Sequence, residues 1–127
     1  MRYVRQEDPM GCMIAAAAMV LDMTYQEAAE KVPLQDASDL VSTGVIAIEK
    51  VRELGQSMGW AVIDLEKPYI LQNDCRYILV IPRELPPLCH AVAVDEFGCV
   101  VDPDCGRESG KQWSDLEVVG LLEFRRI

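Results

Sequence analysis

The chain contains a single histidine, His90, and five cysteines, of which Cys12 comes first, directly after the segment QEDPMG. A cysteine nucleophile requires a thiolate, a base that accepts the thiol proton, a group that orients the base, and a donor for the developing oxyanion. The sequence offers one candidate for each role: Cys12 as nucleophile, His90 as base, Asp102 as orienting carboxylate and Gln6 as oxyanion donor. Because no second histidine exists, this hypothesis of cysteine catalysis depends entirely on His90.

The surroundings of Cys12 favour an ionised thiol. Pro9 and Gly11 interrupt the preceding segment, and the apolar run CMIAAAAMVL then predicts a helix that begins near Cys12. Unpaired N–H groups and the helix dipole at such an end stabilise an anion and can lower a thiol pKa from about 8.5 into the range of about 3.5–7.5. The same N–H groups, and the Gln6 amide from the approach loop, could bind an oxyanion. For Cys12 taken alone, a buried structural cysteine is the competing interpretation.

The interpretation of His90 depends on a predicted hairpin. The segment LCHAVAVD predicts a strand, residues 96–98 a turn, and CVVDP the returning strand. Asp102 would then lie on the neighbouring strand near His90, where its carboxylate could fix the imidazole tautomer. The alternatives are a core histidine and an Asp-Pro turn without a catalytic role. Asp95 and Asp104 compete for the orienting role, although odd spacing puts Asp95 on the strand face opposite His90.

Three helices are expected in the first half of the chain. The run after Cys12 is apolar on nearly every side, so protein must surround it. Thr24 and Glu27 form a capping-box pattern that predicts a second helix over TYQEAAEKV, ended by Pro33. Residues 45–58 carry apolar side chains at helical spacing with charged residues between them, which predicts an amphipathic helix.

The second half predicts strands over WAVIDL, RYILVIP, LCHAVAVD, CVVDP and VVGLLEFR, with a short turn or helix near residues 114–117. Helices followed by strands indicate an α+β fold. The central apolar helix should pack on an antiparallel sheet that contains residues 77–81, 89–95, 99–102 and 118–125. Residues 1–127 form one domain by length.

Composition excludes several classes of protein. Half of the residues are apolar and the net charge is −9, which argues against disorder and against a basic surface for nucleic acid. No segment reaches the roughly 20 apolar residues that a membrane span needs. The run from Cys12 to Leu21 follows two acidic residues and precedes no cleavage site, so we expect a buried helix rather than a signal peptide, and a reduced, cytoplasmic protein.

No cofactor or metal is expected. A zinc site could be drawn from Cys89, His90, Cys99 and Cys105, but these spacings match no common zinc motif. The sequence favours Cys75, Cys89 and Cys99 as small buried apolar residues.

The order of these motifs resembles the papain-like cysteine peptidases, and most closely the C39-like branch with its bacteriocin-leader-processing domains. The matching stretches, which together cover most of the chain, are QEDPMGCMIAAAAMVL, TGVIAIEKVRELGQSMGW, RYILVIP and HAVAVDEFGCVVDP. The resemblance implies a papain-like fold, with Gln6 as oxyanion donor, Cys12 as nucleophile, His90 as base and Asp102 as its orienting group. It also implies substrates with small residues such as Gly before the scissile bond.

The function expected from the sequence is therefore hydrolysis of a peptide or other amide through a thioester on Cys12. The acidic balance favours a peptide or protein substrate that is neutral or basic near the cleft. A catalytically inactive binding module and a thioester-based acyl transferase are the alternatives. The sequence leaves the oligomeric state open.

Overall fold

The computed structural model describes residues 1–36, 38–83, 89–104 and 108–127. It has an α+β architecture in which three helices precede an antiparallel five-stranded sheet. The elements in chain order are α1 (Cys12–Val20), α2 (Tyr25–Ala29), α3 (Leu40–Ser57), β1 (Trp60–Asp64), β2 (Arg76–Pro82), β3 (Cys89–Val94), β4 (Val100–Val101), the 3-10 turn η1 (Trp113–Asp115) and β5 (Gly120–Arg126). The α+β class expected from the order of elements is confirmed.

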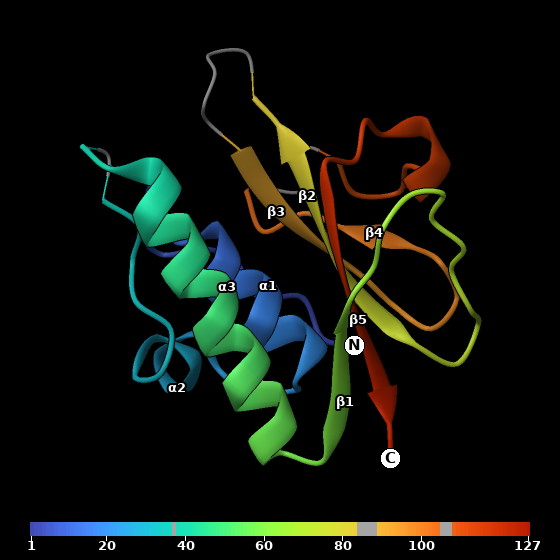
Figure 1. The fold of residues 1–127 in the computed structure, drawn as a ribbon, viewed down its shortest axis with the longest axis horizontal. Helices are drawn as coiled ribbons and strands as arrows, with labels where there is room; N and C mark the ends of the chain where they lie inside the picture. The colour runs from blue at the N-terminus through green and yellow to red at the C-terminus, as the bar shows by residue number, and fades with distance from the viewer. Residues whose placement is uncertain (37, 84–88, 105–107) are drawn as a thin grey trace.

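The strands are arranged in the order β1-β5-β2-β3-β4, and every neighbouring pair is antiparallel. The helices lie together on one side of this sheet, as Figure 1 shows. The sequence predicted the strand at residues 60–64 but not its place in the sheet. It pairs with β5 at the edge, with Trp60 opposite Arg126.

Helix α1 forms the centre of the main core. All nine of its residues are buried, as their uninterrupted apolar character predicted. The helix packs on β3 and β2, while α2 and α3 close its other sides. The small alanine side chains allow this close approach on several sides at once.

A buried cation holds the far end of α1. Arg76, at the start of β2, donates hydrogen bonds to the Val20 carbonyl oxygen and to Asp22, both at 2.8 Å, and to Glu96 at 2.5 Å. A positive charge at a helix C-terminus is stabilised by the helix dipole and by the unpaired carbonyl groups there. Arg76 thus fixes α1 to the sheet, which also fixes the position of the helix start.

Two helix boundaries differ from the sequence prediction. The capping box of Thr24 and Glu27 is present, but α2 ends at Ala29, earlier than expected. Helix α3 begins at Leu40 instead of Val45, because the Asp39 side chain accepts a hydrogen bond from the Ser42 N–H and caps an earlier start.

The sheet face opposite the helices carries a second apolar cluster. Side chains from β2, β3, β4 and β5 form it, and the segments 65–71 and 113–118 cover it. Within the described ranges, no helix has the length and apolar character required to cross a membrane.

Candidate active site

Cys12 is the first residue of α1, and its side chain is nearly buried at 7 % exposure. The Gly11 that precedes it provides no side-chain cap, so the first N–H groups of the helix have no side-chain partner at this cap. A tight turn, closed by the Gly11 N–H on the Asp8 carbonyl oxygen at 3.0 Å, leads the chain into the helix. The nucleophile candidate therefore lies where helix N–H groups can stabilise an anion.

This turn requires a glycine. The Tyr25 hydroxyl group donates a hydrogen bond of 2.7 Å to the Asp8 carboxylate and lies directly beside Gly11. A Cβ atom at position 11 would stand 2.1 Å from that oxygen. Tyr25 thus connects α2 to the turn and fixes the entry to α1.

His90 and Asp102 form the second half of the site. Nε2 of His90 lies 2.6 Å from Oδ1 of Asp102, and both residues are almost completely buried. An ionised carboxylate only accepts hydrogen bonds, so Nε2 carries the proton in this pair and Nδ1 is the nitrogen that can face Cys12.

The carboxylate of Asp102 is itself held in place by backbone groups. Its Oδ1 accepts a hydrogen bond from the Asp104 N–H at 2.8 Å, and its Oδ2 accepts one from the Glu108 N–H at 2.9 Å. The Asp102 N–H donates to the Ser109 hydroxyl group at 2.8 Å. Donors on both oxygens favour the ionised form, which suits a group that orients an imidazole.

The pKa shifts of Cys12, His90 and Asp102 all favour the ionised form of each residue. Burial opposes ionisation of Cys12, but hydrogen bonds with the His90 side chain and the Ala91 backbone outweigh it and leave the thiol pKa below its usual 9.0. Burial also opposes protonation of His90, yet Asp102 and Cys12 together raise its pKa to about 9. The pKa of Asp102 is lowered despite burial, chiefly by the hydrogen bond from His90. A thiolate–imidazolium pair is the favoured state near neutral pH.

Gln6 lies in the approach loop to Cys12, with its side-chain amide in an orientation that the sequence did not predict. Its Nε2 donates to the carbonyl oxygens of Asp8 at 3.1 Å and Pro9 at 3.3 Å. Its Oε1 is buried, and it has no hydrogen-bond partner within the described parts of the chain. The Gln6 N–H donates to the Pro103 oxygen at 3.0 Å, which connects the approach to Cys12 with the loop that carries Asp102.

The competing aspartates have other roles. Oδ1 of Asp95 accepts the N–H groups of Phe97 and Cys99 and closes the β3–β4 turn. Asp104 forms an ion pair with Arg83 at 3.2 Å. Asp102 is therefore the carboxylate that contacts His90.

The burial of the other cysteines differs in part from the prediction. Cys75 is buried as expected, but Cys89 and Cys99 are exposed, so the prediction that they are buried apolar residues was wrong. Both lie at strand ends, where the chain meets solvent. Cys105 falls outside the described residues. Across the described ranges, no three His, Cys, Asp or Glu side chains are grouped closely enough to hold a metal ion.

Two contributors to the site escaped sequence reasoning. The Tyr25–Asp8 hydrogen bond joins residues 17 positions apart, and the Glu108 and Ser109 contacts to Asp102 come from an irregular loop. Neither leaves a periodic pattern in the sequence.

A scan against protein-family models gives no match for this chain, and a search of curated proteins gives none either.

Proposed function

We propose that this protein is a cysteine hydrolase with a papain-like fold of the C39-like branch, which cleaves a peptide or other amide bond. The observation that carries the proposal is the 2.6 Å contact between the buried side chains of His90 and Asp102. Cys12 lies at the start of a helix, and a hydrogen bond with His90 lowers the pKa of its thiol. A buried imidazole with a fixed tautomer beside a low-pKa thiol is costly to maintain and is the arrangement that nucleophilic catalysis requires.

In the proposed reaction, the Cys12 thiolate attacks the carbonyl carbon of the amide. The carbonyl oxygen becomes an oxyanion, and the imidazolium of His90 gives its Nδ1 proton to the leaving nitrogen as the C–N bond breaks. The remaining acyl group forms a thioester with Sγ. Neutral His90 then takes a proton from water, the water oxygen attacks the thioester, and a carboxylic acid leaves as the thiolate–imidazolium pair forms again.

The oxyanion would be bound by the N–H groups at the start of α1 together with the Gln6 amide. Because both amide hydrogens of Gln6 point at backbone carbonyl groups, the side chain must rotate when substrate binds. The unpaired Oε1 makes this rotation inexpensive, since the current orientation leaves a buried acceptor unsatisfied. Gln6→Ala should lower turnover by about 10²-fold if the rotated amide donates to the oxyanion.

The first test is a screen for cleavage of a peptide library that includes small residues, especially Gly, before the scissile bond. Cys12→Ala and His90→Ala should each abolish cleavage, whereas Cys99→Ala, which changes an exposed thiol, should leave the rate unchanged. In parallel, a peptide aldehyde should form a hemithioacetal on Cys12 that mass spectrometry of the trapped, reduced adduct detects. No cleavage across the library together with no modification of Cys12 would contradict the proposal.

A separate experiment tests whether water or an amine accepts the acyl group from the Cys12 thioester. Product analysis with and without an added amine distinguishes hydrolysis from acyl transfer. A carboxylic acid product at all amine concentrations supports the hydrolase, and an amide product at low amine concentration contradicts it.

A further inference from the structure

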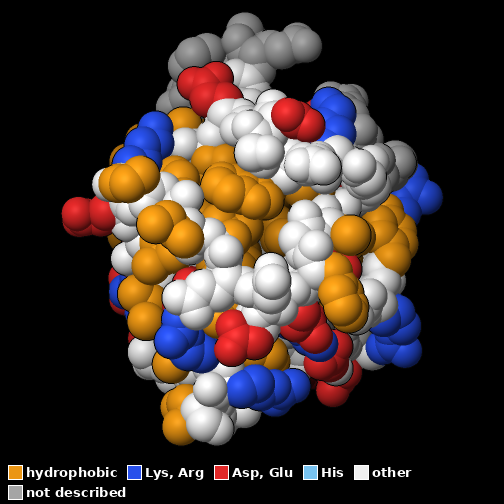
Figure 2. Space-filling model, turned by 90° about the vertical axis from the view of Figure 1, so that its right-hand side faces the viewer, with side chains coloured by type: hydrophobic (Ala, Val, Ile, Leu, Met, Phe, Trp, Pro, Cys, Tyr) orange, Lys and Arg blue, Asp and Glu red, His pale blue; other side chains and the backbone are white. Residues whose placement is uncertain are grey.

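The sheet face opposite the helices contains a cavity of about 370 Å³. It lies between the loop at residues 71–73, the β3–β4 turn at residues 95–99, and residues 110–113. Figure 2 views the molecule from this side, where hydrophobic side chains gather around a hollow. Cys12 and His90 do not line the cavity, so it is separate from the candidate active site.

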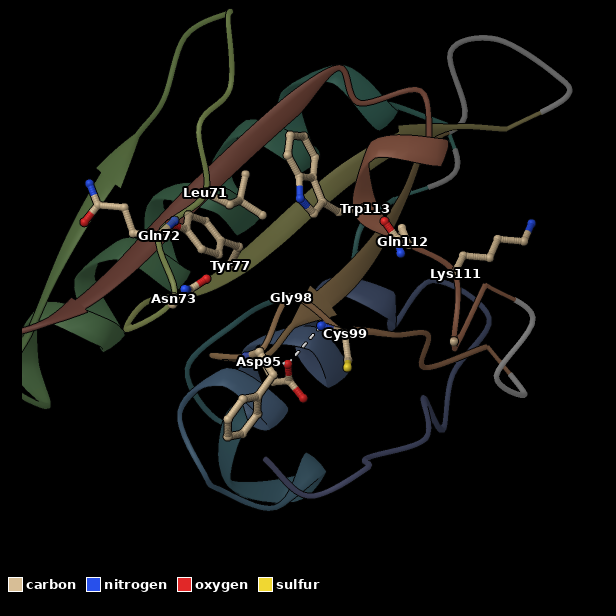
Figure 3. Close-up of a pocket in the computed structure, with 12 residues that line it drawn as sticks. Leu71, Gln72, Asn73, Tyr77, Asp95, Gly98, Cys99, Lys111, Gln112 and Trp113 are labelled. Carbon is tan, nitrogen blue, oxygen red and sulfur yellow. Dashed lines mark hydrogen bonds between the residues drawn. The ribbon is translucent and has the colours of Figure 1, made fainter.

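One end of the cavity is apolar. The side chains of Leu71, Tyr77 and Trp113 lie beside one another there (Figure 3). The Tyr77 hydroxyl group accepts the Gln72 N–H at 2.6 Å and donates to Glu123 at 3.1 Å. Tyr77 is only 1 % exposed, so the partly exposed Leu71 and Trp113 present the apolar surface to a ligand at this end. This end suits an aliphatic or aromatic side chain.

The rest of the rim carries side-chain amides. Gln112 lies beside Lys111 away from the apolar end, and Asn73 lies between Tyr77 and Asp95 (Figure 3). Neither Asn73 nor Gln112 has a side-chain hydrogen bond to any described residue. Each amide presents one acceptor and two donors, the complement of a peptide unit.

The two charged groups at the rim already have hydrogen-bond or ion-pair partners. Asp95 accepts two backbone N–H groups of its own turn, and Lys111 forms an ion pair with Glu108. The lining thus carries one carboxylate and one ammonium group, so no excess of charge favours an ionic ligand. The cavity's volume is near the lower end of the roughly 300–1,000 Å³ typical of ligand pockets, so it suits one or two residues of a chain rather than a folded partner.

We propose that this cavity binds an extended peptide segment, with one aliphatic or aromatic side chain against Leu71 and Trp113 and its main-chain amides paired with Asn73 and Gln112. The site lies at the end of β3 remote from His90, five residues or roughly 17 Å along the strand. Binding there does not require the thiol chemistry, so it stands even if Cys12 is not a nucleophile.

The test uses ¹⁵N-labelled Cys12→Ala protein, which cannot turn over a peptide, titrated with N-acetyl-leucinamide, N-acetyl-phenylalaninamide and N-acetyl-glycinamide. The leucine and phenylalanine probes should shift the amide signals of residues 71–77 and 110–113 and the Trp113 indole signal, with millimolar affinity. The glycine probe lacks the side chain and should bind at least about fivefold more weakly. Benzyl alcohol supplies an aromatic ring without a peptide unit and should also bind more weakly.

Matched variants locate the site. Leu71→Ala should weaken the leucine probe at least about fivefold, whereas Ile70→Ala, which removes a neighbouring exposed side chain outside the cavity, should leave its affinity within about twofold. Gln112→Ala should weaken binding, and Gln56→Ala on exposed α3 should not. Dispersed spectra for each variant establish that it is folded.

Three results would overturn the proposal: no shifts up to the solubility of the probes, shifts that map elsewhere, or equal effects of Leu71→Ala and Ile70→Ala. If benzyl alcohol binds as tightly as the phenylalanine probe, the cavity recognises apolar groups alone and the peptide assignment is wrong.

Discussion

Burial alone would lower the pKa of His90 and favour its neutral form. Its side chain is almost fully buried, yet the carboxylate of Asp102 and the thiol of Cys12 together raise its pKa to about 9. Both partners favour the imidazolium by accepting a hydrogen bond and by opposite charge. The balance of charge at the site is therefore set by three side chains that act together.

The lone histidine makes this balance directly measurable, because its Cε1–H proton resonance has no overlap from another histidine. We expect this resonance to titrate near pH 9. Asp102→Asn removes the charge that stabilises the imidazolium, so it should move the pKa of His90 down toward or below the usual 6.5, and Cys12→Ala should move it in the same direction. Asp74→Asn, a change of charge outside the site, is the control and should leave the titration in place. An unshifted pKa in Asp102→Asn would refute this account.

Thiol alkylation tests the ionisation of Cys12, the partner of His90. Limiting iodoacetamide between pH 6 and 8 should modify Cys12 faster than the exposed Cys99, because Cys12 has the lowered pKa. His90→Ala should raise the pH at which Cys12 reacts. Peptide mapping gives both rates in one sample, with Cys99 as the internal reference. Equal labelling of the two thiols at pH 6 to 7 would count against an activated nucleophile.

The same shifts set the pH dependence of turnover in the proposed reaction. Activity should rise with pH as the first proton leaves the Cys12–His90 pair, below the usual thiol pKa of 9.0. It should fall again near pH 9, where His90 loses the proton that the leaving group needs. A profile of kcat/KM against pH checks both limbs. A rate that still increases above pH 10 would contradict proton donation by His90.

At the residue scale, the sequence predicted which residues form the candidate site better than it predicted how their side chains are oriented. Odd spacing along the strand argued against Asp95 as the partner of His90, but it left Asp104 in competition with Asp102, and only the structure shows that Asp102 contacts His90 while Asp104 pairs with Arg83. The rotamer of Gln6 could not be predicted, because it depends on which backbone carbonyl groups the approach loop turns toward it. Exposure of Cys89 and Cys99 was missed for a related reason, since the ends of predicted strands are the least certain part of a periodic pattern.

Among the elements, the start of α1 is the most sensitive to substitution. Gly11→Ala would put a Cβ atom 2.1 Å from the Tyr25 hydroxyl oxygen and should destabilise the fold by about 1–3 kcal/mol. Adding Tyr25→Phe removes that oxygen and should recover part of the loss. Urea unfolding followed by circular dichroism measures both effects.

Gly44→Ala is the control for this pair. Gly44 lies inside α3, where an added Cβ atom would stand 3.6 Å from its nearest neighbour, Oε1 of Gln35, so alanine should stabilise the helix by about 0.5–1 kcal/mol. If Gly11→Ala proves as harmless as Gly44→Ala, the Tyr25 contact does not constrain the turn.

Element types were easier to predict than element partners. Apolar runs and caps identified all three helices and the strands, because those signals are local. The place of β1 beside β5 could not be read from either segment, since residues 60–64 and 122–126 are joined only by the completed sheet. The burial of Arg76 also escaped prediction, because its three partners come from distant parts of the chain.

On the scale of the whole molecule, Arg76 connects the helical layer with the sheet. Arg76→Ala removes hydrogen bonds to the Val20 carbonyl group, Asp22 and Glu96, and should lower the free energy of unfolding by about 2–3 kcal/mol. Arg52→Ala is the control, because its ion pairs with Glu49 and Asp64 involve exposed carboxylates and should contribute less than about 1 kcal/mol. Equal losses in urea unfolding would show that Arg76 is no more than a surface ion pair.

The position of β5 has a consequence for how the protein is made. Of the described strands it comes last along the chain, yet it lies between β1 and β2. While a ribosome is still synthesising residues 120–126, β1 has no strand to pair with and one edge of β2 is open. The sheet is completed only after this segment emerges, which makes folding late and dependent on long-range contacts. A nascent chain stalled before residue 120 should therefore remain sensitive to protease even though both Cys12 and His90 have already been synthesised.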